Sequence, residues 1–187
     1  MGEQEEGVKP DQIAECSQCA RPFMRRTTLH RVCSPLCAVR SVRAQKKAER
    51  ADTKRRKEAA KPRSQWLKEA QAVVNRYVRL RDAKLGCVSC DKSATWGGQW
   101  HASHFRSVGA ASAVRFNLWN IHKACSICNN WKSGNLSEYE PRLRERIGAE
   151  KVDWLRTQNQ LADFQIEYLK RLKVVFAKRV KRMEKKL

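Results

Sequence analysis

The chain has no long apolar segment. No stretch carries the roughly 20 consecutive apolar residues that a membrane-spanning helix needs. The first residues, MGEQEEGVKPDQ, have neither the basic start nor the apolar run of a signal peptide. Both absences argue against a membrane protein and against export, so we expect the protein to stay in the cytoplasm.

Acidic residues are scarce. The 187 residues include 40 Lys or Arg and only 19 Asp or Glu, which gives a formal net charge of +21. Such an excess attracts phosphate backbones, because each neutralised phosphate releases condensed counterions. Apart from the C-terminal segment, no basic stretch has a bulky apolar face that would suit a membrane surface. Nucleic acid is therefore the expected partner.

Cysteine, in contrast, is plentiful, with eight residues. Disulfides are rare in reducing compartments, so metal binding is the better interpretation. The eight fall into two sets of closely spaced pairs, namely Cys16, Cys19, Cys33 and Cys37, and then Cys87, Cys90, Cys125 and Cys128. Four thiolates from two tight turns suit a structural Zn²⁺, so we predict two such ions.

The order of these features predicts a mostly helical α+β protein with little β structure. We expect a four-cysteine zinc knuckle (1–38), a basic helical linker (39–63), a zinc-stapled core with its leading helix (64–136) and basic amphipathic C-terminal helices (137–187). The linker is either a solvated spacer or an arm that contacts DNA.

Three further patterns concern helices. Ser64 is a predicted N-cap for a helix to about Asp82, and Ser137 with Glu140 has the spacing of a capping box before a break near Gly148. The first helix should bury one face, made of Trp66, Ala70, Val73, Tyr77 and Leu80. Arg76, Arg79 and Arg81 lie elsewhere on it and could meet phosphate.

A C-terminal apolar stripe is the third pattern, and it is made of Leu161, Phe164, Tyr168, Leu172, Val175, Phe176, Val180 and Met183. It could pack on the rest of the chain or on a second copy, and we slightly favour a homodimer.

Histidine and asparagine gather between and just after the second cysteine pairs. His104, Asn120 and Asn129 follow one another in the order of an HNH nuclease whose last position is Asn, so we expect residues 64–136 to form a ββα-metal (HNH) nuclease core. Phosphodiester hydrolysis needs a base for water and a cation for developing charge. His104 can be that base, the amide oxygen of Asn129 suits Mg²⁺ or Mn²⁺, and Asn120 would tie the loop together.

A second ligand for the catalytic metal is needed. Many HNH enzymes have Asp or His directly before the base, but Ser103 stands there in this chain. His101 is our preferred substitute, and His122 is the next. Arg106, Arg115 and Lys132 are candidate phosphate contacts, while Trp96, Trp100, Trp119 and Trp131 either stack on splayed bases or form a small core.

These motifs resemble a known family. KPRSQWLKEAQ, GCVSC, HASHF, RFNLWNIHKACSICNNWKSGNL and ERIG, together with CSPLC around Cys33, resemble the NinG/Rap recombination proteins of lambdoid phages. The resemblance implies a structure-selective endonuclease that cuts branched DNA, such as Holliday junctions and D-loops, in the host cytoplasm. Other phage recombination proteins are then candidate partners.

The placement of Asn129 directly after Cys128 is also similar to that in endonuclease VII, a dimeric phage resolvase with a four-cysteine zinc site. The rival hypothesis is a non-catalytic zinc-finger protein that binds nucleic acid, in which the histidines only contact phosphates.

Overall fold

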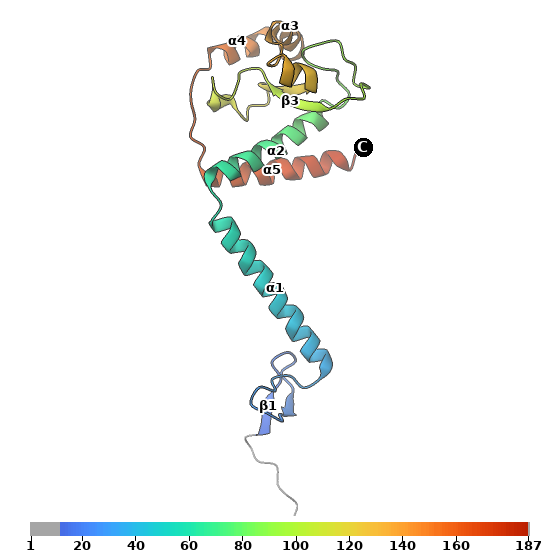
Figure 1. Cartoon of the computed structure of the whole chain (residues 1–187), viewed down its shortest axis with the longest axis vertical. Coiled ribbons are helices and arrows are strands. Elements are labelled where there is room, and N and C mark those ends of the chain that lie inside the picture. Colours follow the sequence, from blue (N-terminus) through green and yellow to red (C-terminus); the bar gives the residue numbers. More distant parts are fainter. Residues whose placement is uncertain (1–11, 187) are drawn as a thin grey trace, which may run out of the picture. The chain divides into compact units, whose positions relative to one another are not determined.

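A computed structural model describes residues 12–186. The chain forms two compact units, and the division between them falls between Lys61 and Pro62 (Figure 1). The prediction that the N-terminal stretch is not a signal peptide concerns residues 1–12, and most of these lie outside the described residues. The finer division at residues 38, 63 and 136 stays a prediction.

The first unit consists of a small hairpin and one long helix. Strand β1 (Ile13–Glu15) pairs antiparallel with β2 (Pro22–Met24), and Ala14 lies opposite Phe23. Helix α1 (Pro35–Ala59) follows, and the hydroxyl of Ser34 caps it by accepting a 3.3 Å hydrogen bond from the Cys37 amide. The basic helix thus begins and ends four residues earlier than predicted.

Helix α1 is solvated along its length. Cys37 is the one buried residue among its 25. Charged side chains cover the remainder, and its apolar Leu36, Val39 and Val42 are exposed. A helix without a buried face owes its stability to propensity and local ion pairs rather than to packing.

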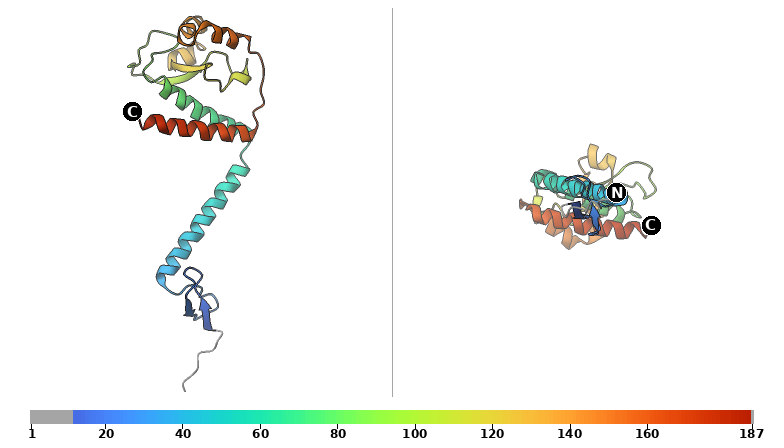
Figure 2. Two further views of the ribbon diagram at one scale, coloured as in Figure 1. Left: turned by 180° about the vertical axis from the view of Figure 1, so that it is seen from behind. Right: turned by 90° about the horizontal axis from the view of Figure 1, so that it is seen from below.

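The second unit rests on a pair of long helices, α2 (Arg63–Arg81) and α5 (Ile166–Glu184), which lie side by side in Figures 1 and 2. Their apolar faces meet around the buried Trp66, Val74 and Leu169. The C-terminal helix therefore packs on its own chain.

A two-stranded antiparallel sheet lies against α2 of this pair. Strand β3 (Trp100–His104) pairs with β4 (Ile121–Cys125), and His104 faces Ile121 across the ladder. Ile121 belongs to the core formed with α2 and α5, whereas Ala124 belongs to a second core on the other side. Opposite faces of the same short hairpin thus join both cores.

The second core is built by the elements around and after the hairpin. These are the 3₁₀ turn η2 (Ser112–Val114), the π-helical turn η3 (Ile127–Trp131), α3 (Leu136–Ile147) and α4 (Ala149–Thr157). Gly148, with a φ of 91°, separates α3 from α4 where the sequence predicts a break.

Both predicted helix caps are wrong. Helix α2 begins at Arg63 with Pro62 at its cap position, so Ser64 lies inside the first turn. Helix α3 begins at Leu136 after Asn135, whose φ of 52° is left-handed, and Ser137 is again inside the helix. Pro62 before α2 is extended and Asn135 before α3 is left-handed, and neither residue forms a side-chain cap.

The predicted apolar stripes are right in type and shifted in register. On α2 the fully buried residues are Ala70, Val74 and Val78, while Val73 and Tyr77 are half-buried beside them. On α5 the stripe includes Leu169, and the predicted Tyr168 and Val175 are exposed. Leu161 precedes the helix and is exposed as well.

The fold class is confirmed as a mostly helical α+β protein with two small sheets. Within residues 12–186, no helix combines the length and the apolarity that crossing a bilayer requires.

Candidate functional site

The N-terminal cysteine cluster lies at the junction of the β1–β2 hairpin and α1. Sulfurs are 3.5 Å apart between Cys19 and Cys33 and 3.7 Å apart between Cys33 and Cys37. Burial acts to raise the pKa of Cys16, but hydrogen bonds from the backbone amides of Gln18, Cys33 and Cys19 outweigh it and lower the pKa to about 6. Backbone donors thus favour a thiolate there.

The second cluster lies inside the core of the second unit. Cys87, Cys125 and Cys128 are each at most 2% exposed, and the sulfurs of Cys90 and Cys125 are 3.8 Å apart. Burial raises the pKa of Cys128, and hydrogen bonds with Cys90 and Cys125 raise it further.

Both clusters could hold a zinc ion. In each set the four sulfurs lie within 4.8 Å of one another. A tetrahedral Zn²⁺ with bonds of about 2.3 Å separates its sulfurs by about 3.8 Å, close to the spacings given above. Four sulfurs this close do not all carry negative charge without a cation among them, so the donor set fits a divalent metal.

His101 and Asn129 are brought together by the hairpin and the turn after it. The Asn129 amide Nδ2 lies 3.1 Å from His101 Nδ1 and donates a 3.0 Å hydrogen bond to Asn130 Oδ1. Among residues 12–186, Oδ1 of Asn129 accepts no hydrogen bond, so this oxygen is free to bind a hard cation. Asn129 directly follows Cys128, so the core cysteine cluster that contains Cys128 also fixes the position of Asn129.

A polar cavity of about 430 Å³ opens beside this pair. Its lining includes Asn75 and Arg79 of α2 in addition to His101 and Asn129. Burial lowers the pKa of Arg79, and the charge of Arg76 lowers it further. No carboxylate in the described part of the chain pairs with Arg79, so this half-buried cation is available to an anion such as phosphate.

His104 lies three residues beyond His101 on the same strand. Its Nε2 is 3.0 Å from the carbonyl oxygen of Arg115, so Nε2 carries the proton and Nδ1 is the acceptor. Burial lowers the pKa of His104, which the Arg115 carbonyl partly offsets. The imidazole is therefore neutral at pH 7.

The structure does not bring His104 into contact with the His101–Asn129 pair. Strand side chains alternate between faces, so His101 and His104 point to opposite sides of β3, with Cα atoms about 10 Å apart at the usual rise. The two predicted parts of the site are neighbours along one strand and do not form a single cluster.

Ser103 and His122, the alternatives for the second metal ligand, are both in the core. The hydroxyl of Tyr139 donates to the Ser103 carbonyl at 3.0 Å and lies 3.4 Å from His122 Nδ1. Burial lowers the pKa of His122 to about 3, with a further contribution from the charge of Arg81. Neither Ser103 nor His122 lines the cavity that contains His101 and Asn129.

Asn120 is fully buried and holds the loop between the strands. Its Oδ1 accepts a 2.7 Å hydrogen bond from the Arg106 amide. Its Nδ2 donates to the carbonyls of Arg106 and Val114, each at 3.1 Å. This one side chain fixes the loop that carries Arg115, and hence the partner of His104.

The predicted phosphate contacts differ in their surroundings. Arg106 donates to the Gln158 carbonyl and the Asn159 side chain, so it has a role within the fold. Arg115 donates a 2.8 Å hydrogen bond from Nε to Gln71, and Lys132 is exposed. Of the arginines on α2, Arg81 is bound to Asp82 and to the carbonyls of Leu118 and Ile121.

A polar row on α2 contains Arg79, which the sequence predicts as a phosphate contact, and two residues that it did not single out, Gln71 and Asn75. Gln71, Asn75 and Arg79 recur every four residues and so share one face of the helix. Gln71 contacts Arg115 at the His104 end, and it donates a 2.7 Å hydrogen bond to Asn75. Asn75 and Arg79 line the cavity at the His101 end. The polar spacing of four was the available signal, hidden beside the stronger apolar stripe.

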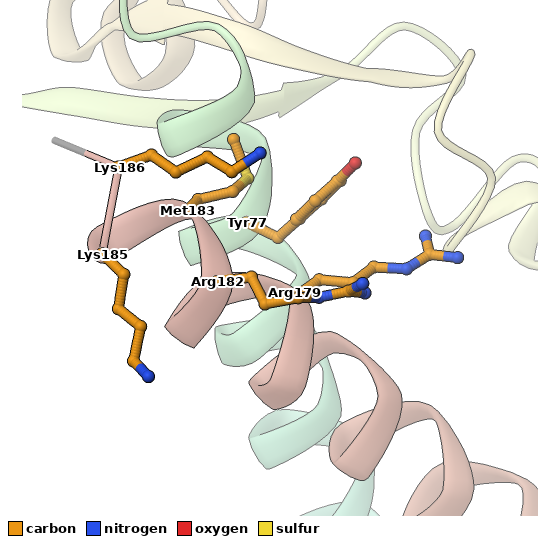
Figure 3. Close-up of a pocket in the computed structure, with 6 residues that line it drawn as sticks. All are labelled: Tyr77, Arg179, Arg182, Met183, Lys185 and Lys186. Carbon is orange, nitrogen blue, oxygen red and sulfur yellow. The ribbon is translucent and has the colours of Figure 1, made fainter.

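A cationic pocket of about 500 Å³ occupies another side of α2, where α5 ends. It is lined by Tyr77, Arg179, Arg182, Met183, Lys185 and Lys186 (Figure 3). The guanidinium of Arg179 lies 5.8 Å from the centre of the Tyr77 ring. Tyr77 is two residues from both Asn75 and Arg79, so it faces away from the polar row. Two surfaces of the second unit are thus suited to a polyanion.

Comparison with known proteins gives one family. The family described as Bacteriophage Lambda NinG protein matches residues 8–186. The chain is 44% identical to protein ninG of Escherichia phage lambda over 126 residues, which are 67% of this chain and 61% of that protein.

Protein ninG of Salmonella phage P22 is 42% identical, again over 67% of this chain and 61% of the relative. Protein ninG of Escherichia phage 933W is 41% identical over 67% of this chain and 62% of the relative. The chain therefore spans about six-tenths of the length of these relatives. No solved structure matches it.

Proposed function

This chain belongs to the NinG family of bacteriophage proteins, and from that premise we propose that it is a metal-dependent endonuclease that cuts branched DNA during phage recombination. The observation that carries the proposal is the meeting of His101 and Asn129 in a cavity that is also lined by Arg79, which has no carboxylate partner among residues 12–186. An imidazole, an amide oxygen and a free guanidinium beside open space suit a divalent ion and a phosphate.

In the proposed site, Asn129 Oδ1 and a ring nitrogen of His101 hold Mg²⁺ or Mn²⁺. Such an ion, when bound, neutralises charge that develops on the phosphate and on the departing 3′ oxygen. Arg79 would bind a nonbridging oxygen of the same phosphate, because no carboxylate in the described part of the chain pairs with its guanidinium. Asn75 supplies a neutral donor next to it.

His104 is proposed as the general base. Its Nδ1 would take a proton from water, whose oxygen then attacks phosphorus while the 3′ oxygen leaves. The hydrogen bond to the Arg115 carbonyl fixes the required tautomer and stabilises the charge that the ring acquires. This assignment rests on the family motif and the tautomer rather than on contact with His101.

Binding would rest on phosphates rather than base edges. The net charge of +21 and the cationic pocket at the end of α5 support strong, salt-dependent association. Contacts of this kind fix position on DNA without reading sequence, so selectivity for branches would come from shape.

The test is cleavage by the full zinc-loaded chain. Labelled four-way junction, D-loop and duplex of matched sequence are incubated with Mg²⁺, with Mn²⁺ and with neither, and His104→Ala is run beside the wild type. We expect metal-dependent cutting of the branched substrates by the wild type, and binding without cutting by the variant. Metal-dependent cutting that survives in His104→Ala would support the endonuclease proposal but assign the base to another residue.

One observation favours the rival, a zinc-finger protein that only binds nucleic acid. His104 and the His101–Asn129 pair lie on opposite faces of β3. The rival predicts binding with no cleavage of any substrate in either metal.

A further inference from the structure

Trp131 differs from every other tryptophan of the chain. It is 84% exposed, whereas Trp66 is buried, Trp96 packs edge-on against Trp100, and Trp119 packs edge-on against Trp154. Within residues 12–186, no aromatic ring or cation contacts the Trp131 indole. Tryptophan is usually well buried, so an isolated indole that is largely exposed to solvent points to a ligand that covers it.

The backbone after Trp131 keeps the indole in solvent. Ser133, Gly134 and Asn135 all have positive φ, at 47°, 91° and 52°. This left-handed turn is fixed to the core cysteine cluster: the Gly134 amide donates to the Cys128 carbonyl at 2.9 Å, and Asn135 Nδ2 donates to the Ser89 carbonyl at 2.6 Å. A turn held at both points leaves the preceding residue little freedom to fold back.

Trp131 also lies in the turn that carries a residue of the candidate site. It ends the turn η3, two residues after Asn129, and the exposed Lys132 follows it. Ile127, one turn earlier on η3, is 39% exposed, and Leu136 is 50% exposed. An apolar projection with a cation beside it therefore belongs to the same short turn as Asn129, on a different side of that turn from the cavity.

We propose that Trp131 stacks on a base at a DNA branch point and thereby sets the preference for branched over duplex DNA. This inference rests on the proposed function. In a continuous duplex both faces of each internal base are covered by neighbours, whereas a branch leaves a base face open. An indole can cover such a face without reading the identity of the base, and the adjacent Lys132 can meet the phosphate.

Binding measurements test this role without any need for cleavage. The full zinc-loaded chain is titrated into a labelled four-way junction and into a duplex of the same sequence, without Mg²⁺ or Mn²⁺. We expect Trp131→Ala to weaken junction binding about tenfold, the effect of losing one base stack, and to leave duplex binding unchanged. Trp131→Phe should restore most of the junction affinity.

Lys132→Ala is the matched control, because it removes a phosphate contact at the neighbouring position and should weaken both substrates equally. A 2-aminopurine at the branch gives a local signal: its fluorescence should fall when the wild type binds and not when Trp131→Ala binds.

Two results would overturn the inference. One is equal junction affinity of the wild type and Trp131→Ala. The other is a dimer, seen by sedimentation, that Trp131→Ala converts to monomer with no change in junction preference, which would make the projection a contact between two copies of the chain. Failure of the endonuclease proposal is separate, because it appears as absent cleavage while these affinities are still measured.

Discussion

Each of the two cysteine clusters has four cysteine sulfurs, but the surroundings of the two clusters differ. The N-terminal cluster is attached to a hairpin whose two strands have three residues each, and to a helix in which no residue other than Cys37 is buried. The core cluster is part of the apolar core that includes Val88, Ala124 and Leu143. Metal binding in the first unit would hold one local turn, whereas in the second it would hold the strands and turns that carry His101, Asn129 and Trp131.

The largest expected effect comes from breaking each cluster in turn. Cys125→Ser should remove most of the folding free energy of the second unit, because structural zinc sites contribute many kcal/mol and this one lies in the core. Cys19→Ser should leave the main thermal transition in place. Circular dichroism melts and the zinc content of both variants check this, and equal melting temperatures for the two would contradict the contrast.

His104→Ala extends the comparison to the histidines. We expect its cleavage rate to fall by about 100- to 10,000-fold, the usual contribution of a general base. His30→Ala, in the first unit, should keep the wild-type rate. Full activity in His104→Ala would contradict the assignment of His104 as the general base.

The pH profile gives a separate test of the same residue. Burial lowers the pKa of His104 below 6.5, so the ring stays unprotonated, and able to accept a proton, at lower pH than an exposed histidine would. The acidic limb of kcat/KM should therefore fall below pH 6.5. A limb above pH 6.5 would contradict the assignment of His104 as the base.

Core truncations compare the helices of the two units. Leu169→Ala on α5 should cost about 2–5 kcal/mol, since Leu169 is fully buried against α2. Val42→Ala on α1, at a residue that is 48% exposed, should change the free energy of unfolding by less than about 0.5 kcal/mol. Urea unfolding measures both, and a comparable loss for Val42→Ala would mean that α1 has a packing partner.

The smallest effect concerns phosphate contacts. Lys181→Gln with Arg182→Gln on α5 should lower the slope of log K against log salt by roughly two, one for each lost contact. Lys54→Gln with Lys57→Gln on α1 distinguishes a DNA-contacting arm from a spacer, because only an arm would lose the same amount. An unchanged slope for the α5 pair would exclude that helix from the interface.

Much of the fold follows from sequence spacing. Paired cysteines predict both clusters because few other roles require that spacing, and the apolar repeat of Trp66 and Ala70 predicts α2. Glycine at 148 predicts the break between α3 and α4 because its φ of 91° is unfavourable for other residues. Such local signals need no knowledge of tertiary contacts.

What the sequence could not predict depends on tertiary contacts. Ser64 and Ser137 have the residue type of a cap, but each helix begins one residue before the serine, after Pro62 and after Asn135. Whether a tryptophan is buried depends on its partner, so Trp119 and Trp131 look alike until Trp154 is seen beside the first. The same holds for the α2 polar row, because only the structure places Asn75 and Arg79 beside His101 of β3.

The central claim is that the core cluster presents Asn129 and His101 to a catalytic metal. The most direct test is the rate of four-way junction cleavage as a function of Mg²⁺ concentration for the wild type, Asn129→Ala, Asn129→Asp and the control Gln160→Ala, which removes an exposed side-chain amide outside the site. We predict no cleavage by Asn129→Ala, cleavage at lower Mg²⁺ by Asn129→Asp because a carboxylate is the stronger ligand, and a wild-type curve for Gln160→Ala. A wild-type rate and metal dependence in Asn129→Ala would contradict the claim.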